Sequence, residues 1–110
     1  MSNSDAKVTR GSDNVFADLG LANAAEEALK ADLAISIRQT IQKKGLTQAQ
    51  AAELLGESQP NVSMIVGGKL WPFSTERLMK HLTALGKDVE LRIKDAPKSR
   101  SRGHLKVVGG

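Results

Sequence analysis

Four residues near the middle of the chain have types and a spacing that suit one shared task. Gln48, Ala52, Gly56 and Val62 follow one another at intervals of four, four and six residues. A small residue such as Ala52 lets two short helices cross closely. Gly56 can take the positive φ that a tight turn between them requires. Val62 then fills the angle between the helices. This spacing is the helix-turn-helix pattern, and the chemistry that it carries is non-covalent binding.

Covalent catalysis and metal binding have no comparable set of residues. His81 and His104 are far apart in the sequence and have no metal-ligand set around them, and we expect His81 at the surface of its helix. There is no Ser-His-Asp arrangement with supporting context and no phosphate-cradling glycine loop. The chain has no cysteine, which excludes a disulfide framework and a cysteine-based zinc site. We therefore expect neither an enzyme nor a cofactor or metal.

A long helix is predicted over about residues 22–44. One apolar stripe recurs every fourth residue, through Leu29, Leu33, Ile37 and Ile41. Gly45 ends this helix in the manner of a C′ glycine. Ile35 falls off the stripe. We expect the opening segment NVFADLGL to form a short helix of its own that folds back, so that Phe16 and Leu19 cover Ile35.

Two short helices follow in the prediction. Thr47 and Gln50 form a capping box at the start of the first, which ends in the tight turn. Ser58 caps the second, expected over about 59–66. Pro60 lies in its first turn, where the missing N–H has no intrahelical partner in any case. By propensity the run NVSMIV could instead be a strand, but a strand would lose the wedge between the helices.

The last part of the domain combines a helix with an alternating segment. The helix begins at Ser74 and stops at Gly86, with its inward face formed by Leu78, Leu82 and Leu85. The segment DVELRIK then places three apolar residues on one face, Val89, Leu91 and Ile93. A lone strand cannot satisfy its backbone. The run LKVV could pair with it inside the chain, but we expect the same strand of a second subunit, which gives a homodimer with an antiparallel ribbon.

These elements predict an all-α bundle of about five helices with one C-terminal β-strand used in dimerisation. Residues 1–13 are polar and expected to be disordered. Residues 14–95 form the domain with its dimerisation strand, and residues 96–110 form a basic, flexible tail. The tail either is a disordered terminus only or adds phosphate contacts that are sensitive to salt.

Charge and hydropathy bound the environment of the chain. The net charge is +4. Residues 38–80 hold six basic and three acidic groups, and the tail holds four basic groups and no acid, so both are candidate surfaces for an anionic partner. No run approaches 18 apolar residues, and the N-terminus lacks a hydrophobic signal segment. We expect a cytoplasmic protein with no membrane contact.

The run LTQAQAAELLGESQPNVSMIVGGK resembles the DNA-binding domain of the Cro/C1 phage-repressor family, called XRE-like, without a gap from Thr47 to Lys69. FSTERLMKHLTALG resembles the later helices of that family. Residues 14–93 as a whole resemble the HigA-type antitoxins. The resemblance implies a lambda-repressor-like bundle that binds double-stranded DNA at a palindromic operator. The two recognition helices of the dimer would lie about 34 Å apart.

The resemblance also implies which residues meet the DNA. Base contacts are implied for Ser58, Gln59, Pro60, Asn61 and Met64. Gln59 can pair bidentately with adenine, and Asn61 can do the same or bind a phosphate. Pro60 and Met64 offer only apolar contact, for instance to a thymine methyl. No arginine lies on this helix, so we expect modest specificity or a reading of DNA shape.

Phosphate contacts are implied for Gln48, Ser63, Gly67, Gly68 and Lys69. Some of these residues could instead have roles that do not involve DNA. Gln48 and Gln59 could be solvated helix starts, and Met64 could be a core or dimer contact. Trp71 and Phe73 are expected to anchor the core and the loop instead of stacking on bases.

Three functions fit these residues. The first is a sequence-specific repressor that is the antitoxin and autorepressor of a toxin–antitoxin operon. It would bind a small basic RNase toxin through acidic residues of the N-terminal third, namely Asp18, Glu26, Glu27 and Asp32. The second is an XRE-type regulator with no toxin partner. The third is a protein–protein interaction module that has lost DNA binding.

Overall fold

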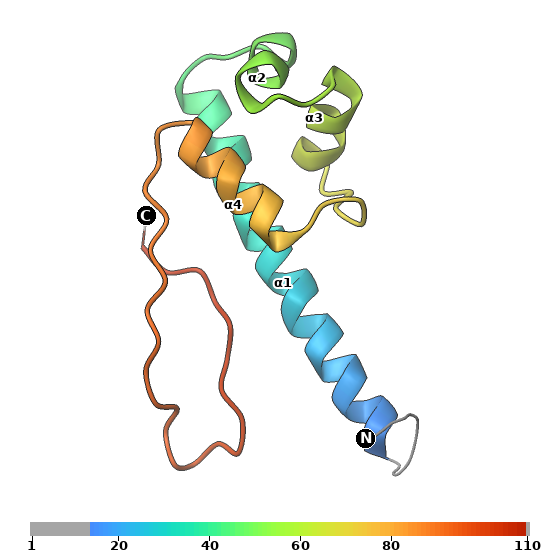
Figure 1. Ribbon diagram of the computed structural model, residues 1–110, viewed down its shortest axis with the longest axis vertical. Helices are drawn as coiled ribbons and strands as arrows, with labels where there is room; N and C mark the ends of the chain where they lie inside the picture. The colour runs from blue at the N-terminus through green and yellow to red at the C-terminus, as the bar shows by residue number, and fades with distance from the viewer. Residues whose placement is uncertain (1–13, 110) are drawn as a thin grey trace.

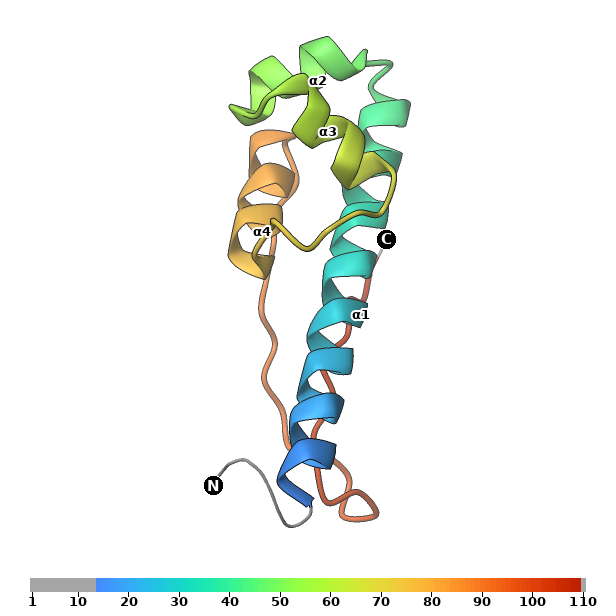
Figure 2. The same ribbon diagram turned by 90° about the vertical axis from the view of Figure 1, so that its right-hand side faces the viewer.

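The computed structural model describes the backbone of residues 14–109 and the side chains of residues 23–109. Four helices lie in that part of the chain: α1 (Asn14–Lys43), α2 (Gln48–Leu55), α3 (Gln59–Val66) and α4 (Thr75–Ala84). Figure 1 shows α4 lying along the C-terminal half of α1, with α2 and α3 gathered at the end of that half. The N-terminal half of α1 projects beyond the other three helices, as Figure 2 also shows.

The long helix α1 confirms the predicted stripe. Leu33, Ile37 and Ile41 are buried in the core, and Leu29 packs against it. The helix ends as expected at a glycine with positive φ, Gly45, whose N–H donates to Gln42 while that of Leu46 donates to Ile41.

The start of α1 corrects the expectation of a separate opening helix. The backbone of residues 14–21 belongs to α1, because alanine-rich sequence as far as Ala28 favours continued helix over a turn. The side chains of Phe16 and Leu19 lie outside the described residues. However, a continuous helix keeps residue 16 about 28 Å from Ile35 along its axis at 1.5 Å per residue. Ile35 itself is 41% exposed.

The helix pair α2–α3 forms as its local signals predict. At Thr47 the capping box is complete, with the hydroxyl accepting from the amide of Gln50 at 3.1 Å and the Gln50 side chain accepting from the amide of Thr47 at 2.9 Å. Gly56 takes the left-handed conformation, with φ of 67°. Ser58 caps α3, and Pro60 lies in its first turn. The segment that could have been a strand is therefore a helix.

The core joins all four helices. Val62 and Ile65 of α3 are buried in the wedge with Ala52 and Leu55 of α2. From α4 and the residue after it come three buried leucines, Leu78, Leu82 and Leu85. These leucines pack with the stripe of α1 in one cluster. The core therefore fixes α3 from behind and leaves its first turn at the surface.

The predicted C-terminal strand is absent from the single chain. No strand occurs within residues 14–109, so the described chain has four helices and no sheet, where five helices and a strand were expected. Val89 packs against the core, but Leu91 and Ile93 are 79% and 94% exposed. The physical reason is the missing partner. Within residues 14–109, no backbone hydrogen bond joins residues 88–94 to LKVV or to any other segment.

Two further expectations concern the N-terminal residues and membrane contact. The predicted disorder of residues 1–13 lies outside them. Among the helices that the structure describes, none is long and apolar enough to cross a membrane.

Candidate nucleic-acid interface

The residues predicted to touch bases lie together at the first turn of α3. Ser58, Gln59 and Pro60 are exposed, and Asn61 is half-buried. The Ser58 hydroxyl accepts from the amide of Asn61 at 3.2 Å, so this oxygen serves the helix cap. Met64, one turn later, is half-buried and packs against the core. The exposed surface available to a ligand here is therefore made chiefly by Gln59 and Pro60.

The residues predicted to touch phosphate flank that turn. Gln48 is half-buried at the start of α2, and Ser63 is exposed on α3. Beyond α3 come three exposed residues, Gly67, Gly68 and Lys69. The amides of these three residues donate to carbonyls of α3 at 2.9, 3.1 and 2.9 Å, respectively. A phosphate at this turn would therefore meet the Lys69 side chain and not free amides.

The two aromatic residues that follow this turn differ in burial. Phe73 is buried, as expected of a core anchor. Trp71 is 72% exposed, so of the expected core and loop roles the core role does not apply to it. Leu70 fills the core position instead.

A buried carboxylate that was not predicted from the sequence lies behind the first turn of α3, which we call the recognition turn. Glu57 follows Gly56 directly, and only 3% of its side chain is exposed. Its Oε1 accepts from Asn61 Nδ2 at 3.0 Å and from Arg77 Nη2 at 2.5 Å. Its Oε2 accepts from Arg77 Nε at 2.6 Å and lies 2.6 Å from His81 Nε2. One buried anion thus joins the turn, α3 and α4.

The surroundings of Glu57 keep it ionised. The hydrogen bond from Arg77 lowers the pKa of Glu57 to about 2 from its usual 4.5. Burial opposes this effect, and the hydrogen bonds from Asn61 and His81 reinforce it. The carboxylate in turn raises the pKa of Arg77. The guanidinium also lies over the ring of Phe73, 4.9 Å from its centre, which adds a cation–π contact.

His81 corrects the expectation of a surface histidine. It is buried, and its Nε2 faces Glu57. Periodicity alone marks the leucine face of α4 and leaves His81 unexplained. The signal that was available is the spacing of Arg77 and His81, four residues apart on one helix face. A matching acid stands in the turn after Gly56.

Of the acidic residues predicted as a surface on the N-terminal third, Glu26 and Glu27 lie in the projecting N-terminal half of α1, and Asp32 lies in its C-terminal half. Glu26, Glu27 and Asp32 are exposed, while the side chain of Asp18 lies outside the described residues. Glu27 is 3.8 Å from Lys30. Within the described residues, no group of histidines and carboxylates could hold a metal ion.

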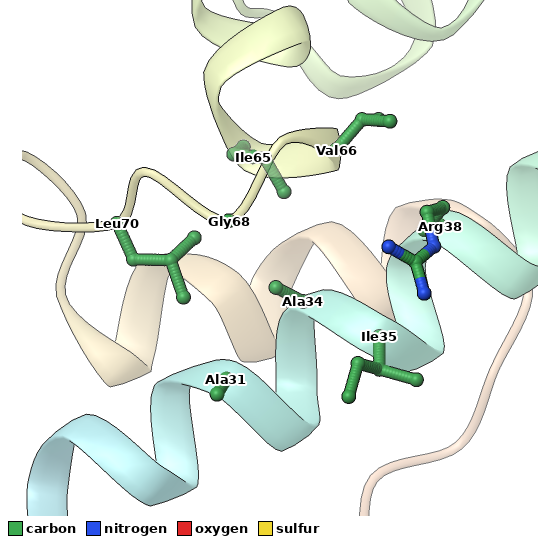
Figure 3. Close-up of a pocket in the computed structure, with 8 residues that line it drawn as sticks. All are labelled: Ala31, Ala34, Ile35, Arg38, Ile65, Val66, Gly68 and Leu70. Carbon is green, nitrogen blue, oxygen red and sulfur yellow. The ribbon is translucent and has the colours of Figure 1, made fainter.

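A shallow groove separates α1 from the end of α3, as Figure 3 shows. Its walls are mostly apolar, with Arg38 at one side, and they comprise Ala31, Ala34, Ile35, Arg38, Ile65, Val66, Gly68 and Leu70. The volume is about 220 Å³. Pockets for drug-sized ligands start at about 300 Å³, so this groove suits a single side chain better than a small-molecule effector.

Comparisons with known proteins agree with this geometry. A protein family described as a helix-turn-helix domain matches residues 15–94. No curated protein matches the chain. One solved structure, described as an XRE family transcriptional regulator, is 42% identical. The match covers 80% of this chain and 99% of that one, with a TM-score of 0.76. The chain therefore belongs to the XRE family of helix-turn-helix regulators, which bind DNA and are not enzymes.

Proposed function

We propose that the chain is a sequence-specific repressor that binds a palindromic operator as a homodimer, with the first turn of α3 in the major groove. One observation carries the proposal. Ser58, Gln59 and Pro60 are exposed at the start of a helix whose cap and core packing are already complete. Such a helix can enter a groove without losing any contact that holds the fold. Repression would follow from occupation of the promoter.

The side chains of this turn favour A·T pairs. The carboxamide of Gln59 matches the N6 and N7 edge of adenine, and Pro60 offers an apolar surface to a thymine methyl. The helix sequence QPNVSMIV contains no arginine or lysine, so it lacks the usual bidentate partner of guanine. Asn61 supplies a second carboxamide, and Met64 adds the exposed part of its side chain.

Contacts to the DNA backbone would fix the register. We assign them to Gln48, Ser63, Gly67, Gly68 and Lys69. Lys69 supplies the positive charge. The two glycines have no side chain to hold a phosphate away from the turn. Gln48 stands at the N-terminus of α2, where a side-chain amide and a helix dipole both favour an anion.

The C-terminal segment would supply the dimer contact. Leu91 and Ile93 alternate with charged residues and are exposed in the single chain. The same segment of a second copy could pair with it antiparallel, which would cover both side chains and satisfy the backbone. Replacing Leu91 and Ile93 by aspartate should yield a monomer in analytical ultracentrifugation. The same change at Leu105 is the control, and a dimer that persists in the first variant would place the interface elsewhere.

The finer proposal is that this repressor is an antitoxin. Glu26 lies in the N-terminal half of α1, which projects away from the helix-turn-helix pair, and Asp32 follows further along the same helix, so a basic partner could bind α1 while α3 contacts DNA. The exposed acids Glu26 and Asp32 would meet a small basic RNase. Lysine at both positions should abolish binding of a toxin encoded beside the gene and spare DNA binding. Glu76→Lys is the matched control, because Glu76 is an exposed acid outside both α1 and the C-terminal segment. If the neighbouring gene encodes no such toxin, the chain is a regulator without one.

The test of DNA binding uses fluorescence anisotropy with the promoter upstream of the gene and a scrambled duplex of equal length. We expect Gln59→Ala to weaken promoter binding about tenfold and to leave scrambled-duplex binding unchanged. Gln39→Ala on the exposed face of α1 is the control. Equal binding of both duplexes by the native chain would contradict sequence-specific recognition. No binding to either would favour an interaction module.

A further inference from the structure

The buried carboxylate of Glu57 dictates which atom of Asn61 faces it. An ionised carboxylate only accepts hydrogen bonds, so the partner that lies 3.0 Å from Oε1 must be the amide nitrogen Nδ2 of Asn61. The carbonyl oxygen Oδ1 diverges from the same carbon and is therefore turned away from Glu57. In a solvated asparagine the two ends of the carboxamide can exchange places, but here the exchange would bring two acceptors together.

Glu57 is itself held from the other side. Arg77 meets both of its oxygens, and His81 meets Oε2, so the carboxylate is fixed by two residues of α4 that are one helical turn apart. Each oxygen thus has two partners, and a rotation of the carboxylate would break at least two short contacts. The orientation of Asn61 is therefore set by α4, through Glu57, and not by Asn61 alone.

We propose that Glu57 is a positioning residue for DNA recognition, which locks Asn61 so that its Oδ1 faces outward as an acceptor. This inference rests on the proposed function, in which the first turn of α3 reads bases. An outward Oδ1 accepts from the amino groups of adenine N6 or cytosine N4. It repels the carbonyl oxygens that guanine and thymine present in the same groove. Glu57 would thereby select amino-bearing over carbonyl-bearing bases at one position of the operator without touching DNA.

The test compares Glu57→Gln with Glu53→Gln. Both variants lose one negative charge, but Glu53 is exposed on α2 and lies outside the network, so it reports the general effect of charge on DNA binding. The glutamine at 57 presents one acceptor and one donor, and Asn61 can then face it with either end. The probe is a duplex selected from a randomised pool by the native chain, together with all its single base-pair variants. Circular dichroism confirms folding.

The base pair read by Asn61 is the one at which Asn61→Ala removes a preference. There we expect the native chain to prefer an amino-bearing base about fivefold or more. Glu57→Gln should abolish this preference, keep the preferences at other positions, and add nothing in the double variant with Asn61→Ala. Glu53→Gln should leave every preference in place. Equal loss at all positions in Glu57→Gln would mean a merely structural role and would overturn the inference.

Two results separate this inference from the proposed function. If Asn61→Ala changes no base preference while Gln59→Ala does, the inference fails and the DNA-binding function stands. If the native chain selects no duplex, the proposed function fails first. If Glu57→Gln does not fold, a measurement on the native chain without DNA still tests the inference. In the native chain, the Nδ2 protons of Asn61 should exchange with solvent more slowly than those of exposed Asn23. Equal exchange rates would show that the lock does not exist.

Discussion

The carboxylate of Glu57 lies 2.6 Å from the imidazole of His81, which comes 24 residues later in the chain. Both side chains are buried, and with Arg77 they tie the turn of the helix-turn-helix pair to α4. Since the carboxylate only accepts, His81 Nε2 carries the proton of this hydrogen bond. The position of the recognition turn thus depends on a polar contact as well as on the apolar wedge.

Acid should weaken the fold through Glu57. The pKa of Glu57 is about 2 in the folded chain and near 4.5 when unfolded, so the unfolded chain binds the proton first. Its stabilising contribution is present above about pH 4.5 and is lost as the pH falls toward 2. The shift corresponds to about 3 kcal/mol of unfolding free energy. Urea denaturation at a series of pH values checks this, and Glu57→Gln should flatten the profile. An equally steep profile in that variant would assign the acid sensitivity to other carboxylates.

Arg77→Ala should destabilise the fold much more than Lys80→Ala. Removal of Arg77 leaves the buried carboxylate without its main partner, and such broken pairs cost about 3–5 kcal/mol when fully buried. Arg77 itself is 42% exposed, so water can partly replace it, and we expect about 2 kcal/mol. Lys80 pairs with Glu76 at 3.8 Å with both side chains about three-quarters exposed, so its loss should cost about 0.5 kcal/mol or less. Chemical denaturation measures the loss of unfolding free energy in both variants. Equal losses would contradict the argument that the burial of Glu57 makes its pair with Arg77 the stronger one.

The parts of the fold that sequence predicted well are those with local causes. The cap at Thr47, the left-handed Gly56 and the cap at Ser58 each act within a few residues, so the bounds of α2 and α3 follow from the local sequence. The opening segment was expected to be a separate helix. It is instead continuous with α1, because the alanine-rich run that joins them has no stop signal. The strand was predicted from alternation together with pairing to a second subunit, and the described part of the single chain supplies no such partner.

The polar contacts around Glu57 could not be predicted from the sequence, for a different reason. Glu57, Arg77 and His81 meet across 20 and 24 residues of sequence, and a charge in a turn normally indicates solvent exposure. Only the packing of α4 against the turn makes that carboxylate buried and bound. The exposed carboxamide of Gln59 was predictable, since spacing from Gly56 places it. The orientation of Asn61 was not, because it depends on these long-range contacts.

Gly56→Ala should cost about 1–2 kcal/mol, because its φ of 67° is the left-handed conformation that side chains disfavour. An added Cβ would meet nothing within 4 Å there, so the cost is conformational and not steric. Gly103→Ala is the matched control, since that position is equally open and has no strained φ. Urea denaturation should show a loss at 56 and none at 103. Similar midpoints for both variants would mean that the turn adjusts its backbone without strain.

Trp71 is the single tryptophan of the chain, which makes its surroundings directly measurable. Because it is 72% exposed, its fluorescence maximum in the folded chain should lie close to that of the urea-unfolded chain. Trp71→Ala should change stability by about 0.5 kcal/mol or less, as is usual for surface substitutions. Phe73→Ala removes a buried ring and should cost about 3–5 kcal/mol. A clearly blue-shifted native emission, or comparable losses in the two variants, would show that Trp71 is packed in solution, either in the core or against a second copy.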